Sequence, residues 1–218
     1  MTVRRQDIWI DFGLSGLTKW FAAPWAGEVT PEELVIEAAS WGDGGYAPTL
    51  LEDAQRLLAS PVPAAVIDRL WCAAIGLPYD PGAVPVEGRA WLDEIVGLCV
   101  ARVRQDDPSF TSASPQPPAN GMLGEAVLRE VREVAPAVVD AVRAAGHSGG
   151  ADVVAAVEQV VVHVDPDLGF RLFLRILKAY MVPITESRYL RYHELGERFG
   201  YHELVVDDGT LQSVADTD

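Results

Sequence analysis

The sequence predicts an all-α protein of about eight helices in two packed helical subdomains, and it leaves open a short strand at either end. Three observations lead to this prediction. Apolar residues recur at helical spacing in most segments, capping residues, prolines and glycines separate those segments, and one proline- and serine-rich stretch divides the chain. The 218 residues are 49% hydrophobic and 22% charged, which suffices for a substantial core and excludes global disorder.

The opening segment, residues 6–27, carries two competing patterns. Ile8, Ile10 and Phe12 alternate with Trp9 and Asp11, as in a short strand. Helical spacing follows and favours a helix up to Pro24. The residues with that spacing are Leu14, Leu17, Phe21 and Trp25.

The rest of the first half reads as a series of helices. Thr30 followed by Pro31 and two glutamates predicts a helix start, and the helix should end near Ser40. Thr49, with Glu52 three residues later, predicts a second start through a capping box. Further helices are expected over 61–76, which includes Val62, and over about 91–104.

Residues 105–121 are rich in proline and serine and predict a linker or long exposed loop. The expected organisation is therefore an N-terminal helical domain over 1–104, this segment, and a C-terminal helical domain with a polar tail over 122–218. In the latter, Pro136 should kink a helix or begin a new one. The valine-rich run 153–164 is predicted helical, and His202–Val206 is a candidate strand.

Charge and cysteine content restrict the class of protein. The net charge is −15, so direct binding to nucleic acid or to an anionic membrane is not expected. No stretch approaches the ~18 apolar residues that a membrane span needs, and no secretory signal is recognisable. The two cysteines, Cys72 and Cys99, lie in apolar helical contexts, as buried free thiols do. We therefore expect a cytoplasmic protein.

No constellation of residues predicts catalysis. His193-Glu194 is followed by Glu197 where a zinc-protease helix would have histidine, and Gly13–Leu17 lacks the context of a nucleophile elbow. The glycine clusters lack the lysine of a phosphate-binding loop. The sequence thus predicts no catalytic residue, no metal and no cofactor.

Basic residues collect in one part of the chain. Residues 170–200 hold six basic and three acidic side chains, and Arg171, Arg175 and Lys178 share one helix stripe. This stripe could dock an acidic partner. We favour the alternative, in which it neutralises acids of the first half within the molecule.

Residues 20–96 resemble the helical immunity proteins of contact-dependent growth inhibition systems, the CdiI-like family. The resemblance rests on an aromatic entry (Trp20-Phe21 to Trp25), an acidic helix start at Thr30, and a Leu-Leu helix from Leu50. The turn Leu77-Pro78-Tyr79-Asp80 and the re-entry Arg89–Ile95 complete it. One departure is Pro24, since such proteins commonly carry an acid before the entry tryptophan. The match covers less than half of the chain.

The resemblance implies a non-catalytic protein that binds and neutralises a cognate toxin, for which a cationic nuclease is one candidate. The expected partner-binding residues are Trp41 and Asp43 on the glycine-rich loop, with Tyr79 and Asp80 on the proline turn. The alternative for Trp41 and Tyr79 is that they cap the core. Two other functions remain open: a helical enzyme or ligand-binding domain with an apolar pocket, and an acidic mimic of nucleic acid.

Overall fold

A computed structural model describes residues 8–78, 87–115, 118 and 120–216. In the first half, helices follow one another with short connections. They are α1 (Gly13–Phe21), the 3₁₀ turn η2 (Ala26–Glu28), α2 (Pro31–Ser40), α3 (Tyr46–Ala59), α4 (Ala64–Ile75) and α5 (Gly88–Asp106).

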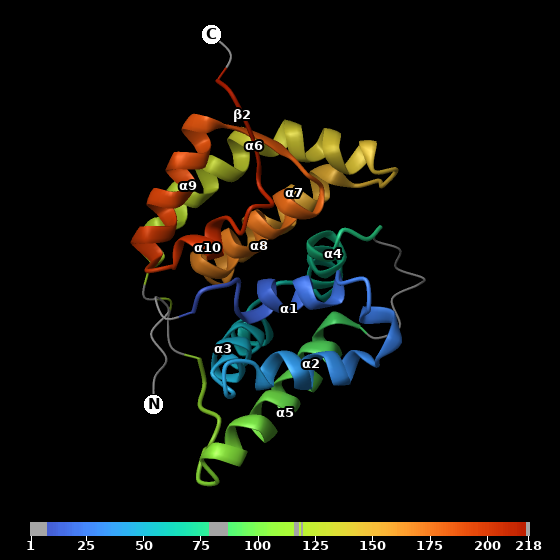
Figure 1. The fold of residues 1–218 in the computed structure, drawn as a ribbon, viewed down its shortest axis with the longest axis vertical. Helices are drawn as coiled ribbons and strands as arrows, with labels where there is room; N and C mark the ends of the chain where they lie inside the picture. Colours follow the sequence, from blue (N-terminus) through green and yellow to red (C-terminus); the bar gives the residue numbers. More distant parts are fainter. Residues whose placement is uncertain (1–7, 79–86, 116–117, 119, 217–218) are drawn as a thin grey trace.

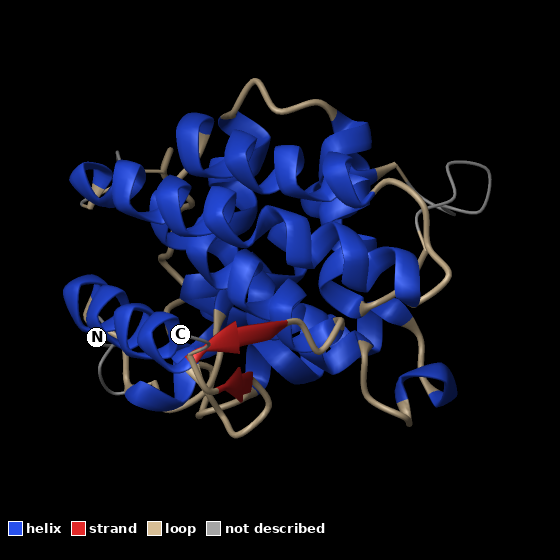
Figure 2. Cartoon of the chain, turned by 90° about the horizontal axis from the view of Figure 1, so that it is seen from above, coloured by secondary structure: helices blue, strands red, loops and turns tan. Residues whose placement is uncertain are grey.

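The second half adds five helices and two very short strands among the described residues. The elements are η3 (Gly121–Leu123), α6 (Gly124–Ala144), α7 (Gly150–His163), α8 (Pro166–Ala179), β1 (Pro183–Thr185), α9 (Glu186–Phe199), α10 (Glu203–Val206) and β2 (Gln212–Val214). β1 and β2 pair in parallel, with Ile184 opposite Ser213. Seen from above, this pair lies at the edge of the helical body (Figure 2).

Helix α8 lies at the centre of the molecule. Twelve of its fourteen residues are buried, and it packs on α1, α4, α6 and α7. In Figure 1 the helices α1–α5 and α6–α10 form two bodies that meet where α8 and α4 approach each other. Buried apolar side chains of both bodies belong to one continuous core.

The predicted all-α class is confirmed, and several local predictions are confirmed with it. Thr30 caps α2 through the predicted motif: Glu33 N–H donates to Thr30 Oγ1 at 3.2 Å, and Thr30 N–H donates to Glu33 Oε2 at 2.7 Å. The valine-rich run forms α7, because its helical periodicity outweighs the weak helix propensity of valine. Pro136, by contrast, does not begin a new helix, because it lies inside the single continuous helix α6.

Two local predictions are wrong, and of the two patterns in residues 6–27 the favoured helix is the one present, as α1. Helix α3 begins at Tyr46 rather than at Thr49, since Pro48 fits the first turn, where its missing N–H is not needed. Thr49 instead donates its hydroxyl to Tyr46 O at 2.9 Å. Residues 8–12 form no strand. The candidate strand 202–206 is the helix α10, in which His202 Nδ1 accepts a hydrogen bond from Leu204 N–H.

The segment between α5 and α6 is exposed along residues 107–114, except for the partly buried Phe110. Phe110 packs on the core, and its carbonyl accepts a hydrogen bond from Arg104 Nε at 3.1 Å. Gln55 of α3 also donates to Ser112. The segment is therefore attached to the first body while it leads to the second.

We predict that cutting this segment leaves the two halves associated, because they share one core. A site-specific protease sequence inserted between the exposed Ala113 and Ser114 should be cleaved in the native protein. The two fragments should then co-elute in size-exclusion chromatography, as the uncut insertion protein does. Separate elution of two folded fragments would contradict the prediction.

Candidate functional site

Three tryptophans form an aromatic cluster on the surface at the end of α1. The ring of Trp20 meets Trp25 edge-on at 5.7 Å between centroids and Trp41 edge-on at 5.5 Å. Trp41 is 51% exposed and Trp25 is 39% exposed, whereas Trp20 is partly buried beneath them. The predicted site residue Trp41 is thus half accessible and is anchored on another tryptophan. We call Trp20, Trp25 and Trp41 the aromatic surface.

Asp43 lies two residues after Trp41 in a loop of unusual backbone conformation. Gly42, Asp43 and Gly44 all have positive φ, of 60°, 53° and 84°. Glycine adopts this region freely and aspartate tolerates it, whereas most residues are strained there. Asp43 is exposed. The loop therefore holds an exposed carboxylate next to Trp41 in a conformation that few residues accept.

The sequence around the aromatic surface is acidic without interruption. Residues 20–55 contain seven carboxylates and no lysine or arginine. Four of these acids are exposed: Glu28, Glu33, Glu37 and Asp43. The nearest cation to the loop that the structure describes is Arg102, which lies against Gly44 and pairs with Asp106. The other two predicted site residues, Tyr79 and Asp80, lie outside the described residues.

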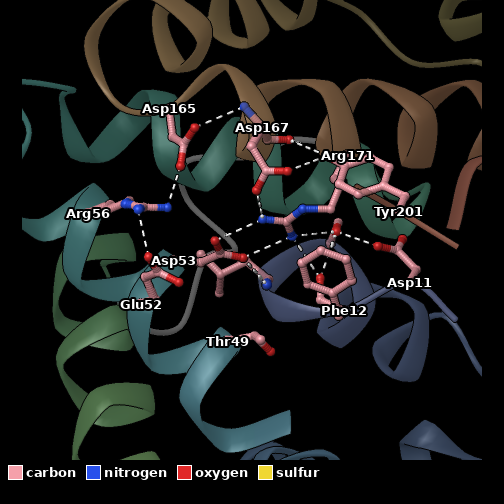
Figure 3. Close-up of polar contacts among 12 residues, drawn as sticks. Asp11, Phe12, Thr49, Glu52, Asp53, Arg56, Asp165, Asp167, Arg171 and Tyr201 are labelled. Carbon is pink, nitrogen blue, oxygen red and sulfur yellow. Dashed lines mark hydrogen bonds and ion pairs between the residues drawn. The ribbon is translucent and has the colours of Figure 1, made fainter. Parts of the chain in front are cut away.

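A second group of charged residues is buried where the two bodies meet (Figure 3). Arg171 of α8 donates from Nη1 and Nη2 to both carboxylate oxygens of Asp53 on α3, at 3.0 and 2.9 Å, and from Nη2 to Asp167 at 3.1 Å. Its guanidinium carbon lies 4.4 Å from the centre of the Phe12 ring. Tyr201 donates its hydroxyl to Asp167. We call Asp53, Asp167 and Arg171 the buried ion cluster.

The start of α1 is shaped by this cluster. Leu14 N–H donates to Asp53 Oδ2 at 2.9 Å, and the Phe12 carbonyl accepts from Arg171 Nη1 at 2.8 Å. Gly13 has a φ of 62°, and a Cβ at this position would collide with the Asp53 carboxylate. Only glycine satisfies both the backbone angle and the space at this position.

A neighbouring pair extends the buried charges. Arg56 of α3 contacts Asp165, the residue that caps α8, and also pairs with Glu52 at 2.6 Å. Burial, together with the nearby Asp167, raises the pKa of Asp165 to about 6, while Arg56 opposes the shift. Burial likewise raises the pKa of Asp11, which accepts a hydrogen bond from Ser15 Oγ at 2.5 Å.

The basic residues Arg171, Arg175 and Lys178 of α8 all contact groups within the molecule. Arg171 neutralises Asp53 of the first half, as we expected. Lys178 is also buried and pairs with Asp208 at 3.4 Å, and Arg175 Nε donates to Ala74 O at 3.0 Å. The stripe is therefore used inside the molecule.

Cavities and metal sites were assessed in the described part of the chain. An apolar cavity lined by Leu14, Leu57 and Leu172 measures about 20 Å³, the space of a single water. An open hollow of about 400 Å³ lies between α9 and α10. The described residues contain no group of three or more His, Cys, Asp or Glu that could hold a metal ion. None of the helices described is long and apolar enough to cross a membrane.

Comparisons with protein-family models, with curated proteins and with solved structures found no match to this chain. The resemblance of residues 20–96 to CdiI-like immunity proteins thus stays a prediction from the sequence.

Sequence reasoning missed the buried ion cluster. One signal for it was present: Asp53 lies on the apolar face of its helix, three residues after Leu50 and four before Leu57. A carboxylate in that position is buried only if a cation pairs with it. The partner, Arg171, is 118 residues away in sequence, so no local pattern identifies it.

We predict that Arg171→Leu destabilises the fold by roughly 3–5 kcal/mol, because Asp53 and Asp167 would remain buried without their cation. Adding Asp53→Asn should recover part of this loss, since the amide oxygen can still accept from Leu14 N–H. Urea unfolding of the two single variants and the double variant gives the coupling energy. Strictly additive losses would contradict a direct Arg171–Asp53 interaction.

A second prediction concerns pH. Because the folded pKa of Asp165 lies above its ordinary value of 3.8, the folded protein binds this proton more tightly than the unfolded chain does. Asp165 therefore adds stability as the pH falls through about 6. The variant Asp165→Asn lacks this proton, so its stability relative to the parent should decrease between pH 7.5 and pH 4.5, by up to about 2 kcal/mol. Parallel unfolding curves at both pH values test this, and a difference that is independent of pH would exclude it.

Proposed function

We propose that this chain is a non-catalytic binding protein, an immunity protein that neutralises a cognate toxin in the cytoplasm of the cell that makes it. One observation carries the proposal. Trp25 and Trp41 are partly exposed beside Asp43, in a stretch that has seven acids and no base.

The aromatic surface has the properties of a binding hot spot. Tryptophan is enriched among the residues that dominate binding energy, because it buries a large rigid area at low entropic cost. Edge-on packing against Trp20 fixes the rings of Trp25 and Trp41 before a partner arrives, which reduces the ordering cost of binding. The exposed Ile36 and Val29, 50% and 37% accessible, add apolar area on and just before α2.

The surrounding acids specify the charge of the partner. Exposed carboxylates that form no ion pair accelerate association with a basic protein and disfavour acidic ones. A cationic toxin domain, such as a nuclease, has the required charge. The rival function of a ligand-binding domain with an apolar pocket receives little support, since the apolar cavity between α1, α3, α4, α5 and α8 has room for about one water.

The proposal predicts that protection and stability respond differently to changes on the aromatic surface. Trp41→Ala combined with Asp43→Asn should abolish protection of cells against the toxin domain encoded next to this chain's gene. The melting temperature should fall by only a few degrees, since Trp41 is half exposed and asparagine also tolerates positive φ.

The matched control changes equivalent groups elsewhere. Met122→Ala with Glu125→Gln removes one exposed apolar side chain and one exposed carboxylate outside the aromatic surface. This control should protect as well as the parent. The proposal is overturned if the adjacent genes encode no toxin, or if the Trp41/Asp43 variant protects fully while it remains folded.

A further inference from the structure

The hollow between α9 and α10 is lined by residues of both helices and of their connection. His193, Gly196 and Glu197 come from α9, Tyr201 and His202 from the connection, and Glu203 and Val206 from α10. Gly196 allows α10 to approach α9 closely, because a Cβ at position 196 would collide with Val206. With about 400 Å³, the hollow has the volume of a small-molecule site.

The polar groups of the hollow are mainly acceptors without partners. Glu197 and Glu203 form no ion pair or side-chain hydrogen bond with the residues described here, although other glutamates of this region pair with arginine. His193 Nε2 is buried and has no hydrogen-bond partner in the described part of the chain. A buried polar atom without a partner is a place where a bound molecule can supply the missing hydrogen bond. The lining thus offers two unpaired carboxylates and contains no lysine or arginine.

His202 contributes one donor and part of an aromatic stack. Its Nδ1 accepts from Leu204 N–H at 3.2 Å, so the neutral ring carries its proton on Nε2. Its ring stacks on Trp9, with 5.8 Å between centroids and 23° between planes. Trp9 is 67% exposed, which leaves much of the indole open beside His202.

From this lining we propose that the hollow between α9 and α10 binds a guanidinium group. Guanidinium offers five N–H donors and no acceptor, which complements two carboxylates and an unpaired imidazole nitrogen. Its planar cation bonds carboxylates in pairs and stacks on aromatic rings, as a compact ammonium does not. This site lies outside the aromatic surface, and the proposal does not depend on the immunity function.

The guanidinium can belong to a small molecule or to an arginine side chain of a protein. Agmatine represents the first source. A capped pentapeptide whose only charged residue is a central arginine represents the second. The same peptide with citrulline in place of arginine is the control for charge, because it keeps the shape and most N–H groups. Binding is followed by NMR, through the ring signals of His193 and His202 and the indole signal of Trp9.

We expect saturable binding with a dissociation constant of about 1 mM or lower for at least one guanidinium probe. The citrulline peptide should bind at least tenfold more weakly. Glu197→Gln with Glu203→Gln should also weaken binding at least tenfold. Glu194→Gln with Glu125→Gln removes the same charge from exposed positions outside the hollow and should leave affinity unchanged.

The outcomes separate the possibilities. Tighter binding of the arginine peptide than of agmatine would identify a protein side chain as the source, and the reverse would identify a small molecule. Equal binding of arginine and citrulline peptides overturns the proposal. So does unchanged affinity in the Glu197/Glu203 variant, provided that its NMR spectrum shows a folded protein.

Discussion

The burial of α8 on nearly all sides is the constraint on which the rest of the structure depends. A helix in that position must pair every charge it carries within the protein, since an isolated buried ion is very costly. Arg171 meets this requirement through Asp167 of its own helix and through Asp53 of α3, which reaches it from the other body. The ion cluster therefore fixes how α3 and α8 approach each other. Gly13 allows the start of α1 to lie against the Asp53 carboxylate.

The same contacts give the aromatic surface a rigid support. Helix α1 has only nine residues. Its first turn is bonded to the buried ion cluster through Leu14, and its last turn carries Trp20 and Phe21. Phe21 packs edge-on against Trp71 and Trp91, which ties the end of α1 to α4 and α5. Helix α1 is thus fixed at its first and its last turn, which positions Trp20. Trp25 and Trp41 pack against Trp20. Binding residues placed on such a support need little reordering.

The sequence predicted what depends on local chemistry and missed what depends on distant partners. The class, the start of α2 and the helix α7 follow from periodicity and capping, which act within a few residues. The strand expected at 202–206 was wrong because a short apolar run does not distinguish strand from helix, and the actual β-pair joins segments 29 positions apart. Of the candidate site, the sequence indicated Trp41 and Asp43. The edge-on packing against Trp20 and the hollow beside His193 depend on contacts between separate elements, which no local pattern predicts.

The distribution of charge connects the interior with the proposed binding sites. Among the described residues, five acids and three bases are buried, and burial favours the neutral form of two of those acids, Asp11 and Asp165. The buried side chains thus carry a formal charge of only −2, so most of the net charge of −15 lies outside them. Part of that surface is neutralised locally, where Arg188 and Arg191 face Glu130 and Glu133. The loop at Asp43 and the hollow at Glu197 carry exposed carboxylates that no ion pair in the described structure neutralises. An attractive field remains at these two places, and a basic partner gains most by binding there.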